Sequence, residues 1–213
     1  MSRREIDSRG EKAMGVFLDT YFYPKATTKR AFAYYERIYA KELQKKGIDV
    51  LIDKDKKIDE KAQLYYINQP VDSFAFEIDY YDEKNEMVVD GWFIENNETD
   101  EYLLMWIPKA RTNHINRLVA EDFICVNADL LQKKRIQAYV EQLGLTKKVL
   151  KEKANMMRNE NIERMDISDM CHIVYSIKGF SERPINLVVE KTVIDDLSDR
   201  IFEIKKDELK ILR

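Results

Sequence analysis

Two carboxylates and a lysine lie close together in the stretch GIDVLIDKDKKIDEKAQ, residues 47–63. Asp49 lies in one short apolar run, 48–52, and Asp59 and Lys61 lie in the next, 58–62. Converging carboxylates repel each other unless a cation lies between them, and hard oxygen ligands suit Mg²⁺. A neighbouring lysine can orient an attacking water and offset charge on a phosphate. These residue types therefore point to metal-assisted phosphodiester hydrolysis.

The two apolar runs are predicted to form a β-hairpin with a polar turn between them. Strand side chains alternate with period two, so Asp49, Asp59 and Lys61 can share one face of the hairpin. A three-residue loop pairs Asp49 with Asp59, whereas a five-residue loop pairs Asp49 with Lys61, and both loop lengths are common. In either case Glu60 points to the opposite face.

The pattern resembles the signature of the PD-(D/E)XK nuclease superfamily, in which one strand carries an acid and the next carries acid-x-Lys. Here the residues are Asp49 and Asp59-Glu60-Lys61. Members often carry a glutamate on the first core helix, and Glu11 in SRGEKAMGVFL stands at the corresponding place. Asp49 follows Ile48, where the superfamily often has proline. The resemblance covers roughly residues 8–140.

The resemblance implies an α/β fold, a restriction-endonuclease-like core with a central mixed sheet flanked by helices. It implies that Asp49, Asp59 and Glu11 bind Mg²⁺, with Mn²⁺ as a substitute, and that Lys61 acts with them in catalysis. The expected function is a Mg²⁺-dependent nuclease acting on DNA. A homodimer is a possible assembly. The alternatives are a catalytically inactive module of the same fold that binds nucleic acid or a protein, and an ordinary salt-bridged hairpin.

Charge is unevenly distributed along a chain whose net charge is −3 at pH 7. Residues 70–107 hold eleven acidic residues and one basic residue, so this segment could instead dock a partner. Basic residues dominate the segment 133–158: Lys133, Lys134, Arg135, Lys147, Lys148, Lys151, Lys153 and Arg158. A nuclease needs contacts that position the phosphate backbone, and this basic segment is the expected source. The alternative is a solvated helix face.

The surrounding pattern predicts the elements that must hold these residues in place. One helix is expected over 11–24, with Pro24 as its stop, and a second over 30–46, capped by Gly47. Strands are expected over 74–82, 87–95 and 101–108, and a helical segment over 127–159. The remainder is predicted to form strands at 171–177 and 185–191, a short helix at 193–201 and a strand at 202–206. With no Pro/Gly/Ser-rich linker and no repeat, we expect a single domain over 1–213.

Other functional classes have little support in the sequence. Cys125 and Cys171 lack CxxC spacing and lie in apolar surroundings, so we expect buried thiols rather than a disulfide or a zinc site. His114 and His172 lie too far apart for a metal-binding motif. No stretch approaches the roughly 18 apolar residues of a membrane span, and MSRREIDSRGEK lacks the apolar region of a signal peptide. The expected location is cytoplasmic, with no membrane partner.

Overall fold

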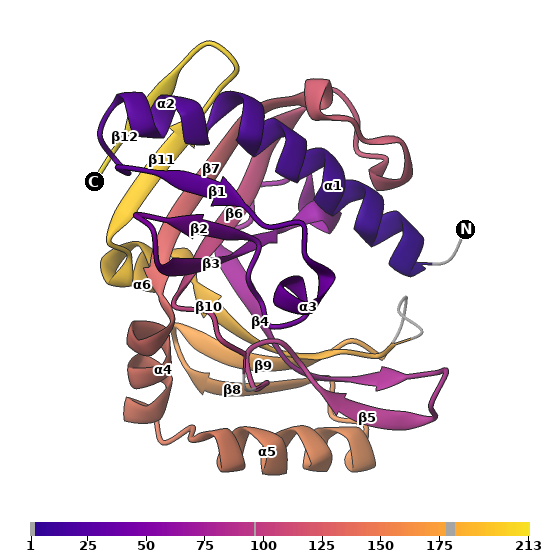
Figure 1. The fold of residues 1–213 in the computed structure, drawn as a ribbon. Coiled ribbons are helices and arrows are strands. Elements are labelled where there is room, and N and C mark those ends of the chain that lie inside the picture. Colours follow the sequence, from indigo (N-terminus) through magenta and orange to yellow (C-terminus); the bar gives the residue numbers. More distant parts are fainter. Residues whose placement is uncertain (1–2, 96, 178–181) are drawn as a thin grey trace. The chain divides into compact units, whose positions relative to one another are not determined.

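Two β-sheets organise the chain in the computed structural model, which describes residues 3–95, 97–177 and 182–213 (Figure 1). One sheet has seven strands and the other has five, and helices accompany both. The α/β class predicted from the sequence is confirmed. The chain divides into two compact units: unit 1 comprises Met1–Val71, Glu98–Lys133 and Leu197–Arg213, and unit 2 comprises Asp72–Asn97 and Lys134–Asp196. The single-domain organisation stays a prediction.

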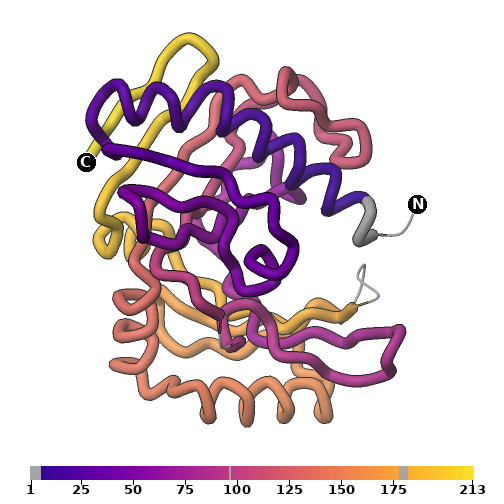
Figure 2. Tube along the Cα trace, in the orientation of Figure 1, coloured from indigo at the N-terminus to yellow at the C-terminus, as the bar shows by residue number. Residues whose placement is uncertain are grey.

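The seven-stranded sheet of unit 1 has the order β1-β2-β3-β6-β7-β11-β12. Its β3–β6 pair is parallel and its other pairs are antiparallel, so it is a mixed sheet. Its strands come from early, middle and late parts of the chain, which meet side by side in Figure 2. The strand bounds are Tyr35–Arg37 (β1), Val50–Ile52 (β2), Lys56–Ala62 (β3), Glu101–Ala110 (β6), Phe123–Gln132 (β7), Arg200–Ile204 (β11) and Leu209–Ile211 (β12).

Helices α1 (Arg3–Tyr21) and α2 (Tyr23–Thr28) cover one face of this sheet (Figure 1). Apolar residues of α1 at helical spacing, among them Met14, Phe17 and Leu18, are buried in one core with strand residues such as Val50 and Ile58. The short elements of unit 1 are α3 (Lys41–Gln44) and the 3₁₀ turns η1 (Leu64–Tyr66), η2 (Ile115–Arg117) and η3 (Ala120–Asp122). This packing fixes the position of α1 over the strands that carry the predicted site.

Unit 2 is built on an antiparallel sheet of order β5-β4-β10-β9-β8. Leu150, Ala154 and Met157 form the buried stripe of α5, the longest helix of this unit. The bounds are Ser73–Asp82 (β4), Met87–Asp90 (β5), Arg164–Ser168 (β8), Cys171–Tyr175 (β9), Ile185–Glu190 (β10), Lys133–Gln142 (α4), Lys147–Glu160 (α5) and Lys191–Leu197 (α6).

Two helical predictions were wrong over part of their length. The segment 30–46 contains strand β1 and only one helical turn, α3, and Tyr39 of its supposed apolar stripe is 81 % exposed. The helical segment 127–159 begins later than predicted, because residues 127–132 belong to β7. Leu130 and Leu131 are both buried there, since both faces of that strand are covered.

The predicted strand 87–95 ends early, at Asp90. The following Gly91 lies so close to β4 that a Cβ atom would stand 2.5 Å from the carbonyl oxygen of Glu77. Only glycine fits this close approach, and the chain turns directly after it, where the Ile94 amide donates to the Gly91 carbonyl at 3.0 Å. Over the residues that the structure describes, no helix combines the length and the apolar character that crossing a bilayer would require.

Candidate functional site

Asp49 directly precedes β2, and its carboxylate lies within electrostatic reach of Asp59 on β3. The register pairs Val50 with Ile58 across a turn of three residues, 53–55, so the shorter of the two predicted loops is the one that forms. Asp49 lies just outside these paired residues, and its amide donates to the Ile58 carbonyl at 2.9 Å. The Asp49 carboxylate in turn accepts a hydrogen bond from the Glu60 amide at 2.9 Å. Asp49 is thereby held against β3 by its backbone and its side chain.

Lys61 forms an ion pair with Asp59 on the same face of β3, with 2.7 Å between Nζ and Oδ1. The Asp59 side chain is only 2 % exposed and that of Lys61 is 27 % exposed. Burial raises the pKa of Asp59 to about 7; Lys61 opposes this rise and the Asp49 carboxylate adds to it. Burial alone would lower the pKa of Lys61, but the carboxylates of Asp59, Asp49 and Glu11 outweigh it and raise that pKa.

Glu11 lies on the exposed side of α1, within electrostatic reach of this pair. Partial desolvation raises the pKa of its carboxyl; Lys61 lowers it, while Asp49 and Asp7 raise it further. The approach of α1 to the end of β3 depends on Gly10, where a Cβ atom would stand 2.7 Å from Leu64 Cδ1 in η1. The structure therefore gathers the four predicted site residues in one region of unit 1.

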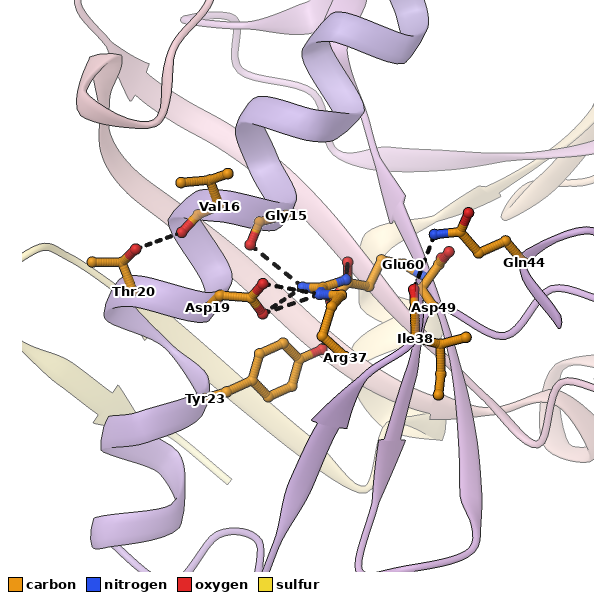
Figure 3. Close-up of polar contacts among 10 residues, drawn as sticks. All are labelled: Gly15, Val16, Asp19, Thr20, Tyr23, Arg37, Ile38, Gln44, Asp49 and Glu60. Carbon is orange, nitrogen blue, oxygen red and sulfur yellow. Dashed lines mark hydrogen bonds and ion pairs between the residues drawn. The ribbon is translucent and has the colours of Figure 1, made fainter. Parts of the chain in front are cut away.

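Figure 3 shows a second polar cluster, which was not predicted from the sequence. It includes Glu60, which strand alternation places on the face of β3 opposite Asp59 and Lys61. Arg37 of β1 donates from Nη1 to Glu60 at 2.5 Å, and from Nη2 and Nε to Asp19 of α1 at 2.8 and 3.0 Å. The Tyr23 hydroxyl donates to Glu60 at 2.6 Å, and the Gly15 carbonyl accepts from Arg37 at 3.4 Å. We call these residues, Arg37, Asp19, Glu60 and Tyr23, the arginine cluster.

Charges in the arginine cluster are shielded from water. The side chains of Arg37 and Glu60 are 12 % and 9 % exposed. Burial raises the pKa of Glu60, with Arg37 acting in the opposite direction and Asp49 adding to the rise. Burial would lower the pKa of Arg37, but Glu60 and Asp19 raise it, so the guanidinium stays charged. Arg37 was not predicted as part of a site because the sequence pattern placed it in a helix. The only signal for a buried cation was Glu60, a third acid in the hairpin whose side chain points toward the core.

The carboxylate oxygens around Asp59 are ligands of the kind that Mg²⁺ prefers, although they do not form a complete metal site as they stand. Among the described residues, no group of three or more His, Cys, Asp or Glu side chains stands close enough to hold a metal ion as it is. Within the same residues, no donor reaches the buried Oδ2 of Asp59. A buried carboxylate oxygen without a donor is costly. The carboxylate groups of Asp59, Asp49 and Glu11 are thus chemically suited to bind a hard divalent cation.

The predicted basic segment is partly engaged in ion pairs inside unit 2. Lys151 pairs with Asp90 at 2.6 Å, and Arg158 forms a buried ion pair with Asp79. Lys147 and Lys148 are exposed. Phosphate binding by this segment stays a prediction.

The aromatics of the predicted strands are mostly in the core, as expected. Phe74, Phe76 and Trp106 are buried, whereas Tyr65 and Tyr66 are 41 % and 48 % exposed. Cys125 and Cys171 are free and buried, which confirms the prediction of buried thiols.

No protein-family model matches the chain, and comparisons with curated proteins and with solved structures also find no match. Membership of the PD-(D/E)XK superfamily stays a prediction, based on the residues of the hairpin and of α1.

Proposed function

We propose that this chain is a Mg²⁺-dependent nuclease that hydrolyses phosphodiester bonds in DNA. The observation that carries the proposal is the geometry at β3, where Lys61 Nζ lies 2.7 Å from Oδ1 of the buried Asp59 and the Asp49 carboxylate accepts a hydrogen bond from the Glu60 amide at 2.9 Å. An acid buried beside a second acid and a lysine is costly for folding and typical of a reaction centre. DNA as the substrate is taken from the resemblance to the nuclease superfamily.

Charge balance supports a divalent cation at this position. When ionised, Asp49, Asp59 and Glu11 carry three negative charges against the single positive charge of Lys61. The difference equals the charge of one Mg²⁺ ion, and such a cation would counteract both the burial and the repulsion from Asp49 that raise the pKa of Asp59. Mn²⁺ prefers similar ligands and is the expected substitute.

Each residue then has a distinct role. Asp59 and Asp49 would hold the cation from the hairpin, and Glu11 would approach it from α1. When bound, Mg²⁺ supplies a more acidic water and stabilises charge on the phosphate. Lys61, released from its ion pair with Asp59, would orient the attacking water and donate to a phosphate oxygen. Its raised pKa keeps the ammonium protonated, so it acts as a donor and not as a general base.

The test is a cleavage assay with single- and double-stranded DNA in Mg²⁺ or Mn²⁺. We expect Asp59→Asn and Lys61→Met to lower the rate by about 100-fold or more, since each removes a group that acts on the reacting atoms. Asp55→Asn in the turn and Lys57→Met on the same strand are the matched controls, and both should keep wild-type activity. If wild-type protein cleaves neither substrate with either metal, the proposal fails.

A catalytically inactive binding module is the second candidate. The observation that favours it is the lack, among the described side chains, of three ligands already close enough to hold a metal. Calorimetry with Mn²⁺ separates the two candidates. A nuclease should bind Mn²⁺ at a site that Asp49→Ala abolishes, whereas an inactive module should give no heat that depends on Asp49.

A further inference from the structure

An exposed aromatic side chain lies directly after the strand that carries the proposed catalytic residues. Tyr65 is in the 3₁₀ turn η1, four positions beyond Lys61, and 41 % of it is exposed. Tyr34, Tyr39 and Tyr66 of unit 1 are exposed as well, so the position of Tyr65 close to the proposed site sets it apart, not its exposure alone. Large aromatics at a surface are frequently binding residues, because they offer much contact area at little conformational cost.

Contacts with α1 connect Tyr65 to the proposed site. Its hydroxyl donates to Asp7 Oδ1 at 2.5 Å. Asp7 lies four residues, about one helical turn, before Glu11 on α1, so the two carboxylates lie on the same side of the helix. Leu64, next to Tyr65, is the residue that α1 approaches so closely at Gly10. Tyr65 is therefore anchored at the same end of β3 as the carboxylates and the lysine.

The negative charge of this region favours substrate contacts that do not depend on charge. Asp59, Asp49 and Glu11 place negative charge around Lys61, and Asp7 adds negative charge next to Glu11. Charge alone would repel a polyphosphate chain from such a site in the absence of a cation. Stacking of a base on an aromatic ring requires no positive charge, and it is tolerant of base identity.

We propose that Tyr65 is a base-stacking residue of this site, and that the substrate is a nucleic acid whose bases are unpaired next to the cleaved phosphate. This inference rests on the proposed nuclease function. In a duplex each base is already stacked between its neighbours, so a ring at the rim of the site gains a partner only from single strands, frayed ends or flipped nucleotides. The hydrogen bond to Asp7 fixes the edge of the ring and reduces the entropy lost on binding.

The test measures binding without turnover, in full-length protein carrying Asp59→Asn. The probe is a single-stranded DNA oligonucleotide with one 2-aminopurine, whose fluorescence is quenched by stacking. In this background, Tyr65→Leu should weaken binding by about tenfold and remove the quenching, which corresponds to the typical cost of losing one stacked base. Tyr65→Phe keeps the ring and should bind within about threefold of the parent.

Tyr34→Leu is the matched control. Tyr34 is 44 % exposed and its hydroxyl also donates to a carboxylate, Glu36, but it neighbours the turn at the other end of the hairpin, where its carbonyl accepts from the Asp53 amide. It should bind and quench like the parent. A blunt duplex should bind equally to the parent and to Tyr65→Leu, and a single-stranded RNA arm identifies which kind of unpaired strand is preferred.

Two results would overturn the inference: equal binding of single strands by Tyr65→Leu and its parent, or an equal loss for Tyr65→Leu and Tyr34→Leu. Absence of any DNA or RNA binding would overturn it as well. The outcome is independent of catalysis. Ring-dependent quenching in a protein whose wild type cleaves nothing would support stacking and refute the nuclease, and cleavage without ring dependence would do the reverse.

Discussion

Replacing Arg37 by methionine removes the central charge of the arginine cluster while preserving much of its apolar stem. Glu60 would then be a carboxylate with a 9 % exposed side chain, and Tyr23 would remain its hydrogen-bonding partner. Asp19, whose side chain is 29 % exposed, can be solvated by water. The cost of the substitution should therefore come mainly from Glu60.

Breaking a buried ion pair from one side typically destabilises a protein by about 3–5 kcal/mol. Because Glu60 keeps the 2.6 Å hydrogen bond from Tyr23 and Asp19 is partly exposed, we expect a loss near the lower end, about 3 kcal/mol at pH 7.5. Burial already raises the pKa of Glu60, and losing Arg37 must raise it further. At lower pH the variant can protonate Glu60 and avoid a buried charge, so the loss should shrink as the pH falls.

The measurement is urea unfolding of wild type, Arg37→Met, Glu60→Gln and the double variant at pH 7.5 and pH 5. The double variant should be more stable than the sum of the single losses implies, with a coupling energy of about 1–3 kcal/mol. Asp55→Asn, which changes an exposed turn carboxylate, is the control for a general effect of charge. A loss below about 1 kcal/mol for Arg37→Met, or additive single losses, would refute the view that Arg37 is needed to bury Glu60.

Further predictions concern the buried acid, the closest helix contact and the thiols. The pKa of Asp59 is raised to about 7, whereas an aspartate in the unfolded chain loses its proton near pH 4. As the pH rises from about 4 to about 7, the folded protein therefore holds a proton that the unfolded chain has released, and its stability falls. In urea unfolding, metal-free wild type should lose up to about 4 kcal/mol over this range relative to Asp59→Asn. An unchanged difference across this pH range would contradict the raised pKa. Gly15→Ala should raise the unfolding temperature through better helix propensity, since its Cβ would meet atoms no closer than 3.8 Å, whereas Gly10→Ala should give no gain because of its contact with Leu64. Equal gains for the two variants would argue against close packing at Gly10. Cys171, buried and with a pKa raised to about 11 by burial, should react with a thiol reagent only after denaturant is added, and rapid labelling of the native protein would contradict this.

The hairpin was predictable because its determinants are local. Period-two alternation alone predicts that Asp49, Asp59 and Lys61 share a face and that Glu60 does not, and the ion pairs of Lys61 with Asp59 and of Arg37 with Glu60 agree with this for β3. The choice between two loop lengths was not predictable, since both satisfy the same alternation. The turn formed with positive φ angles at Asp53 and Lys54, which aspartate tolerates better than most residues.

Non-local contacts account for what the sequence could not indicate. Tyr35, Ile38 and Tyr39 have the spacing of a helical stripe, but Arg37 between them is drawn into β1 by its ion pairs with Asp19 and Glu60. These partners lie 18 and 23 positions away, beyond the window in which periodicity is read. The end of β7 was mistaken for a helix for a related reason.

A strand covered on both sides gives adjacent apolar residues, which can equally well fit a buried helix. Leu130 and Leu131 of β7 are such a pair. How deeply each face of the strand is buried depends on packing against segments elsewhere in the chain. The local pattern of apolar residues does not indicate this.

The charged residues on the two faces of β3 also disfavour a shifted pairing of the hairpin strands. A slip of the pairing by one residue would exchange the two faces and turn Lys61 toward Arg37, bringing two cations together in a buried place. The same slip would move Glu60 away from both Arg37 and Tyr23. The native register pairs Glu60 with Arg37 and Lys61 with Asp59, so the arginine cluster favours this alignment of the hairpin.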